Sequence, residues 1–84
     1  RKAALYHWRA QSGGEVDLLL ERDGTLYPVE IKLASRPTRN DARGFASLRA
    51  TYPRLRIAPG LVIAPAERVE RLTDTDVVAP YDMV

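Results

Sequence analysis

An Asp-Gly pair between two apolar runs constrains this chain more than any other feature of its sequence. Asp23 and Gly24 separate residues 15–22 from residues 25–33, and both runs are rich in leucine, valine and isoleucine. Asp-Gly favours a type I′ turn, which needs positive φ at both central residues and joins two antiparallel strands. The sequence therefore predicts a β-hairpin over residues 15–33.

The two-residue turn determines which residues face each other across the predicted hairpin. Asp17 lies opposite Glu30, and Glu15 lies opposite Lys32. Two carboxylates that face each other across neighbouring strands repel, so the Asp17–Glu30 pair needs a positive charge beside it. Lys32 is one candidate for that charge and a divalent cation is the other. Mg²⁺ suits such a pair, because it binds through one or two carboxylates and completes its shell with water and substrate phosphates.

Alternation along the two strands predicts a polar face and an apolar face. The acids share the polar face with Lys32. The apolar face is predicted to carry Val16, Leu18, Leu20, Val29, Ile31 and Leu33. The three consecutive leucines at 18–20 are typical of an interior strand that is covered on both sides. Pro28 has no N–H to donate, so we expect strand pairing to be interrupted beside it.

A helix is predicted after the hairpin. Thr38 is suited to the N-cap position, and Asp41 places an acid in the first turn. Apolar residues recur at i, i+3 and i+7 between residues 41 and 52, which predicts a helix with one apolar stripe. Gly44 costs this helix about 1 kcal/mol relative to alanine, so we expect it to allow a close approach to the sheet.

Strands on either side of these elements complete the predicted fold. Residues 5–9 form a strand that makes an antiparallel meander with the hairpin. Residues 57–64, interrupted by Pro59 and Gly60, return to the sheet after the helix as a strand, so they run parallel to the second hairpin strand. Residues 66–72 are expected to form a turn and an irregular strand, and residues 77–79 a short last strand. The predicted fold class is α/β: a mixed sheet of four or five strands with one main crossover helix, in a single domain over residues 1–84.

Composition excludes several classes of function. The chain has no cysteine, so it has neither disulfides nor thiolate metal sites. Its one histidine, His7, has no second histidine with which to form a zinc site. No apolar run is long enough to span a membrane, and there is no P-loop motif, so the chain is not itself a P-loop ATPase. These absences are compatible with a cytoplasmic location, which we expect.

Positive charge is concentrated in one part of the chain. The formal net charge is +2, which permits nucleic-acid binding. Arginines recur between residues 36 and 56, and we expect Arg36, Arg39 and Arg43 to gather near Lys32 and contact phosphates. A solvated helix face is the alternative explanation of this pattern.

The acidic residues of the hairpin also resemble a known signature. Asp17, twelve intervening residues and then Glu30-Ile31-Lys32 resemble the PD-(D/E)XK nuclease motif. Together with Trp8 and the run Gly13-Gly14-Glu15-Val16-Asp17, they resemble an uncharacterised domain that often follows an AAA-type ATPase module in bacterial and archaeal proteins. That domain is placed in the restriction-endonuclease-like superfamily, and the resemblance covers about residues 6–81. It implies a restriction-endonuclease-like core that lacks its first helix.

The resemblance also implies a catalytic site. Asp17 and Glu30 would hold Mg²⁺ or Mn²⁺, and the carbonyl of Ile31 would supply a further oxygen. Lys32 would polarise the attacking water or neutralise charge on the phosphate. The expected activity is metal-dependent phosphodiester hydrolysis on DNA, in a longer protein that carries an ATPase module before this domain.

Several alternatives remain open at this point. The domain could be a catalytically inactive module that binds nucleic acid or protein and regulates an ATP-binding protein. Asp17 and Lys32 could form a plain ion pair across the two strands. Glu15 is either a further site carboxylate or the surface partner of Lys32. An exposed edge strand in so small a domain makes a homo-oligomer plausible.

Overall fold

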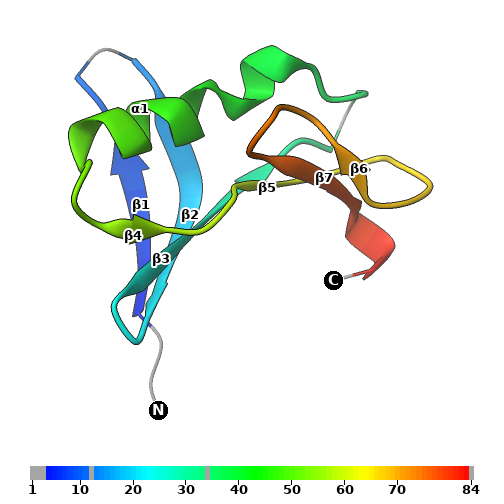
Figure 1. Ribbon diagram of the computed structural model, residues 1–84. Coiled ribbons are helices and arrows are strands. Elements are labelled where there is room, and N and C mark those ends of the chain that lie inside the picture. The colour runs from blue at the N-terminus through cyan, green and yellow to red at the C-terminus, as the bar shows by residue number, and fades with distance from the viewer. Residues whose placement is uncertain (1–3, 12, 34, 84) are drawn as a thin grey trace.

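One mixed sheet forms the centre of the molecule. The computed structural model describes residues 4–11, 13–33 and 35–83. Within these residues, the sheet has the order β1-β2-β3-β5-β7-β6, and β4 pairs with β3 (Figure 1). The strands are β1 (Ala4–Arg9), β2 (Glu15–Arg22), β3 (Thr25–Ile31), β4 (Arg56–Ile57), β5 (Leu61–Ala64), β6 (Glu70–Arg71) and β7 (Val77–Pro80). The helical elements are η1 (Arg39–Ala42), α1 (Arg43–Thr51) and η2 (Tyr81–Met83).

The hairpin forms as predicted. β2 and β3 pair antiparallel with Arg22 opposite Thr25, and the same register continues as far as Leu18 opposite Val29. The turn residue Asp23 has φ of 53° and Gly24 has φ of 82°. Both values are positive, as a type I′ turn requires.

A β-bulge interrupts the pairing of β1 with β2. The register shifts between Tyr6 and Trp8, so Asp17 and Leu18 of β2 together lie opposite the single residue His7. A bulge bends its strand and re-aims the side chains beside it. The regular alternation of faces predicted for residues 15–22 therefore breaks at Asp17.

Parallel pairing joins the hairpin to the second half of the chain. β5 runs parallel to β3, as the crossover predicts, and β7 runs parallel to β5. The predicted strand over residues 57–64 is two strands, β4 and β5, and both pair with β3. Pro28 lies between the β4 pairing, which ends at Leu26, and the β5 pairing, which begins at Val29. The expected interruption beside this proline is confirmed.

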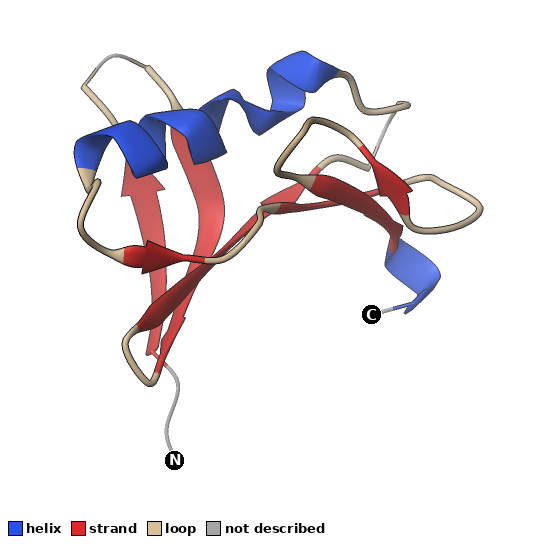
Figure 2. Cartoon of the chain, in the orientation of Figure 1, coloured by secondary structure: helices blue, strands red, loops and turns tan. Residues whose placement is uncertain are grey.

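The crossover helix begins with a 3-10 turn. Thr38 is the N-cap of η1, as predicted. α1 follows directly after η1 and ends at Thr51. Figure 2 shows η1 and α1 running one after the other across one side of the sheet. A Cβ on Gly44 would overlap the carbonyl of Glu15 on β2. The expected close approach of this helix to the sheet is therefore confirmed.

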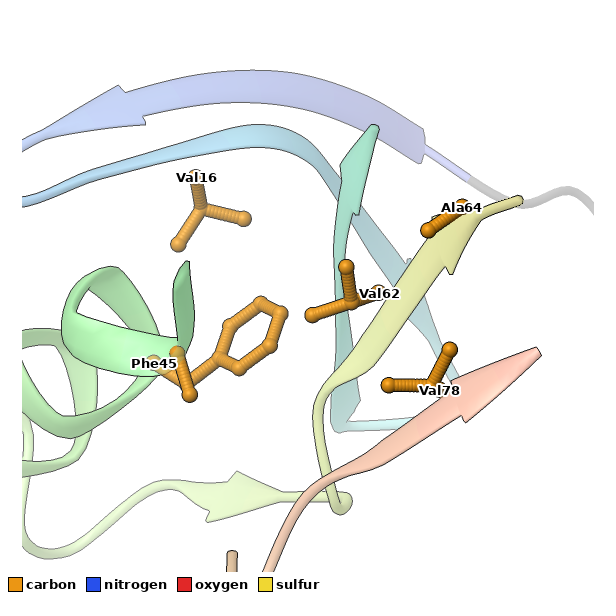
Figure 3. Packing of buried hydrophobic residues seen from close by; sticks show 6 residues of the cluster. Val16, Phe45, Val62, Ala64 and Val78 are labelled. Atoms are coloured by element: carbon orange, nitrogen blue, oxygen red, sulfur yellow. The ribbon is translucent and has the colours of Figure 1, made fainter. Parts of the chain in front are cut away.

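The core lies between α1 and one face of the sheet. In Figure 3 the ring of Phe45 projects from α1 toward Val62 on β5. The buried cluster comprises Val16, Ala42, Phe45, Val62, Ala64 and Val78. Trp8, Ala66 and Leu72 pack against it from its edges.

The apolar face predicted for the hairpin is not the face that the helix covers. Residues that pair across a sheet share a face, so Ile31 shares one with Ile63, whereas Glu30 shares the helix side with the buried Val62. Leu18 is 39% exposed and Ile31 is 42% exposed. Of the six residues predicted for the apolar face, Val16 belongs to the core cluster, because the bulge turns it toward the helix. The prediction that the leucines at 18–20 are covered on both sides is wrong.

The fold class is the predicted one in its coarse outline. The described residues form a mixed α/β arrangement with an antiparallel meander, parallel strands after it and one α-helix between. The sheet has more strands than the expected four or five, because the strand predicted to return after the helix is divided into β4 and β5. β6 lies within residues 66–72, where an irregular strand is expected. None of the described helices is long and apolar enough to cross a lipid bilayer.

Candidate metal centre

Asp17 and Glu30 contact each other where the β2–β3 ladder ends. The backbone N–H of Asp17 donates to Glu30 Oε1 at 2.9 Å. The backbone N–H of Ile31 donates to Asp17 Oδ2, also at 2.9 Å. Each carboxylate thus accepts a backbone N–H from the other strand of the hairpin. The two acids predicted to lie opposite each other are held together by these two bonds, with the peptide of Ile31 beside them.

The donor set of this pair fits a hard divalent cation. One oxygen of each carboxylate accepts an N–H, and the described residues give no hydrogen bond to Asp17 Oδ1 or Glu30 Oε2. Two carboxylates with open coordination positions are what Mg²⁺ uses when it keeps several waters. Among the described His, Cys, Asp and Glu residues, no group of three or more is arranged to hold a metal. The pair would therefore offer a metal two carboxylates and open positions for water, which differs from the closed four-ligand site that structural zinc takes.

The surroundings of Glu30 disfavour its charged form. Burial raises the pKa of the Glu30 carboxyl, and the negative charges of Asp17, Glu15 and Asp41 raise it further. The hydrogen bond from the N–H of Asp17 acts in the opposite direction. A bound cation would relieve this accumulation of negative charge.

The ammonium of Lys32 bonds Asp41, a residue that was not predicted to belong to the site. Its Nζ lies 2.9 Å from Asp41 Oδ1 and 3.0 Å from Asp41 Oδ2. Its backbone N–H bonds the carbonyl of Ile63 on β5 at 2.8 Å. The expected pairing of Glu15 with Lys32 is wrong, because the β2–β3 register ends at Leu18 opposite Val29 and the Lys32 side chain bonds Asp41.

Glu15 has other partners. His7 Nε2 lies 3.6 Å from Glu15 Oε2, and Arg9 Nη2 lies 3.7 Å from the same oxygen. Both partners come from β1, whose register with β2 shifts at the bulge so that Arg9 lies opposite Glu15. His7 Nδ1 also lies 3.4 Å from the carbonyl oxygen of Asp17.

Asp41 is the residue that sequence reasoning treated only as a helix-capping acid. It does cap the helix, since the N–H of Thr38 donates to Asp41 Oδ2 at 2.7 Å. Although burial favours its neutral form, the Thr38 N–H and the Lys32 ammonium hold the pKa of Asp41 below its ordinary value. The signal that could have found this second role is an acid in the first turn of the helix that follows the lysine strand.

A polar depression of about 190 Å³ lies beside Glu30. Its lining includes three carboxylates and one guanidinium, and Arg43 Nη2 donates to the carbonyl of Gly13 across it at 3.4 Å. The residues lining it are Gly13, Glu15, Glu30, Asn40, Asp41, Arg43 and Gly44.

Of the three arginines expected to gather near Lys32, the structure brings two together. Arg39 and Arg43 both line a depression of about 300 Å³ between the helix and residues 73–76, along with Arg49. Arg36 lines a different depression, of about 450 Å³, with Tyr81 and residues that follow β5. Arg36 lies apart from Arg39 and Arg43 because it precedes the helix and lies beside the C-terminal end of β5, near Ala64 and Pro65.

Comparisons with known proteins give a domain family and two relatives. The chain is 35% identical over 80 residues to an uncharacterised protein of Mycobacterium bovis and to one of Mycobacterium tuberculosis. The matched region is 95% of this chain but 17% of the length of each relative, so the chain spans about a sixth of them. No solved structure matches the chain significantly. The model of a domain family of unknown function, DUF4143, matches residues 1–84, and the chain therefore belongs to that family.

Proposed function

We propose that this domain is a metal-dependent nuclease that hydrolyses phosphodiester bonds in DNA. The observation that carries the proposal is the Asp17–Glu30 pair, in which each carboxylate accepts a backbone N–H from the other strand of the hairpin and the charge of Asp17 raises the pKa of Glu30. Like charges placed opposite each other destabilise a sheet. A cation bound between them would remove that cost, and the resemblance to the PD-(D/E)XK motif with its restriction-endonuclease-like core supports this assignment.

Each residue of the site has a distinct role in this proposal. Asp17 and Glu30 would hold Mg²⁺ or Mn²⁺, with the carbonyl of Ile31 as a further oxygen ligand. When bound, the ion supplies the Lewis acid that phosphodiester hydrolysis uses. Lys32, a cation two residues beyond Glu30, stabilises negative charge that develops on the phosphate. Arg39 and Arg43, which share one depression on the helix, contact the phosphate backbone of the substrate.

The longer polypeptide forms a second part of the proposal. The relatives are about six times the length of the matched region. Through the resemblance, we propose that an AAA-type ATPase module precedes the domain in such a chain and acts with it on DNA.

Cleavage of supercoiled plasmid DNA tests the proposed activity. The protein is incubated with Mg²⁺ or Mn²⁺, in parallel with Asp17→Asn, Glu30→Gln and Lys32→Met. Each substitution should lower the cleavage rate at least about 100-fold, the size of effect seen when one electrostatic contributor is removed from an active site. Glu67→Gln changes an exposed carboxyl outside the hairpin and should leave the rate unchanged. Cleavage that is equal in all five proteins would contradict the proposal.

A second candidate is a non-catalytic module that binds nucleic acid or protein. The observation that favours it is the size of the acidic site, since the described residues offer no group of three or more metal ligands. Under this alternative the wild type would bind DNA or the ATPase module, and no metal ion would induce cleavage. The plasmid assay combined with a DNA-binding assay separates the two.

A further inference from the structure

The ammonium of Lys32 has two competing sets of acceptors in this fold. One is the Asp17–Glu30 pair, whose Glu30 precedes Lys32 by two residues in the chain. The other is Asp41 on η1. The structure shows the second arrangement, with Lys32 Nζ within 3.0 Å of both oxygens of Asp41.

Asp41 is also held in place by hydrogen bonds that do not involve Lys32. Its Oδ2 accepts the N–H of Thr38 at 2.7 Å, and its own backbone N–H donates to the carbonyl of Thr38 at 2.9 Å. The carboxylate is therefore fixed by the first turn of the crossover helix. The side chain of Lys32 is 30% exposed and that of Asp41 is 18% exposed, so the ion pair is partly shielded from water.

The location of this ion pair matters because of the charge beside it. Glu30 experiences the negative charges of Asp17, Glu15 and Asp41 together. Of these acids, Glu15 lies near His7 and Arg9, and Asp41 holds Lys32. A cation that entered the Asp17–Glu30 pair would neutralise it, and Lys32 is the covalently attached cation closest to it along the strand.

We propose that Asp41 is a positioning residue that holds the Lys32 ammonium out of the Asp17–Glu30 pair and so leaves that pair to a divalent cation. The inference rests on the proposed function, because it assumes that the pair binds metal. It assigns to the helix cap a role in the site: the same carboxylate that begins the helix keeps the lysine beside the metal and not in its place.

Asp41→Asn separates the two roles of this residue. The asparagine Oδ1 can still accept the N–H of Thr38, but it carries no charge to retain the ammonium. Lys32 is then expected to turn toward Asp17 and Glu30 and to compete with the metal. We expect the dissociation constant for Mn²⁺, measured by calorimetry with the metal alone, to rise about tenfold in Asp41→Asn.

The double variant decides whether the effect acts through the lysine. In Lys32→Met/Asp41→Asn no ammonium remains to compete, so Mn²⁺ should bind at least as tightly as to the wild type. If Asp41 acted only through its charge on the metal, the effects of the two substitutions would add, and the double variant would bind about tenfold more weakly than Lys32→Met alone. Additivity of this kind would overturn the inference.

Further outcomes are also decisive. Equal Mn²⁺ affinity in the wild type and Asp41→Asn would overturn the inference and leave the proposed function standing. Failure of the wild type to bind Mn²⁺ would overturn the proposed function and the inference with it. Asp41→Glu keeps the charge and should bind Mn²⁺ within about threefold of the wild type, which keeps the test valid if Asp41→Asn unfolds. A tenfold loss in that charge-conserving variant would count against the inference.

Discussion

At the scale of single residues, the unusual feature is a pair of carboxylates joined by the backbone. Asp17 and Glu30 are held together by two N–H groups, although their charges repel each other and burial disfavours ionised Glu30. A local arrangement that opposes stability is often found at functional sites, where another gain offsets the cost. The pair should therefore lower the free energy of unfolding of the metal-free protein.

Glu30→Gln tests whether the pair costs stability. The glutamine Oε1 can still accept the N–H of Asp17, while the repulsion with Asp17 disappears. We expect thermal and urea unfolding in the presence of a chelator to show a protein stabilised by up to about 1 kcal/mol. The control Glu67→Gln should change stability by less than about 0.5 kcal/mol. A clear loss of stability in Glu30→Gln would mean that Glu30 has a structural role.

Asp41 should give stability a characteristic dependence on pH. Its pKa is lower in the folded protein than in the unfolded chain, so folding favours its ionised form. Its contribution is complete above the unfolded pKa, about 3.9, and is lost as the pH falls through the lower folded value. The free energy of unfolding should therefore fall more steeply below about pH 5 in the wild type than in Asp41→Asn. Parallel curves from pH 6 to pH 3 would contradict this account.

At the scale of elements, one buried ion pair ties α1 to the loop before β7. Asp76 is 1% exposed, and both of its oxygens accept from Arg49 at 3.0 Å. The N–H of Gly60, just before β5, donates to the same carboxylate at 2.7 Å, and the hydroxyl of Thr73 donates to it at 3.2 Å. This network fixes the helix relative to the parallel strands and so places η1 and Asp41 near the hairpin.

Arg49→Met should be among the most destabilising single changes in the chain. It leaves the buried carboxylate of Asp76 without its cation, and breaking a buried pair in this way costs about 3–5 kcal/mol. Urea unfolding measures the loss. Arg54→Met removes an exposed arginine just beyond the helix and should cost less than about 0.5 kcal/mol. Similar stability of the two variants would contradict the assigned role of Asp76.

The elements that the sequence predicts well are those set by local chemistry. The turn at Asp23 and Gly24, the N-cap at Thr38 and the parallel return of β5 follow from short-range rules and are confirmed. The bulge opposite His7 depends on how β1 aligns with β2, which no local pattern encodes. The contact between Asp17 and Glu30 could be predicted from the register of the turn. The partners of Glu15 and Lys32 could not, because they depend on the bulge and on the position of the helix.

At the scale of the whole molecule, the sheet has one covered face and one open face. Strand pairing places Leu18, Val29 and Leu61 on the same side, and Tyr27, Ile31 and Ile63 also lie there. Leu18, Tyr27 and Ile31 are exposed on this side. The helix side carries the core cluster and Glu30. Exposed apolar side chains gathered on one face of a sheet are typical of an interaction surface.

Matched substitutions on the two faces test which of them is the core. Ile31→Thr adds a hydroxyl on the open face and should change stability by less than about 0.5 kcal/mol. Val62→Thr, one register position away on β5, buries a hydroxyl among the core residues and should cost about 1–3 kcal/mol. Urea unfolding of both variants provides the comparison. Equal losses would mean that the open face is covered in solution.

The most direct test of the central claim is to locate a bound metal ion by NMR. Mn²⁺ broadens the signals of nuclei close to it, so small additions to the isotope-labelled protein report where it binds. We predict that the amide signals of Asp17 and Ile31, the two N–H groups that bond the carboxylate pair, weaken first, and that Glu30→Gln abolishes this effect. Broadening that begins elsewhere, or that is the same in Glu30→Gln, would contradict a metal centre at Asp17 and Glu30.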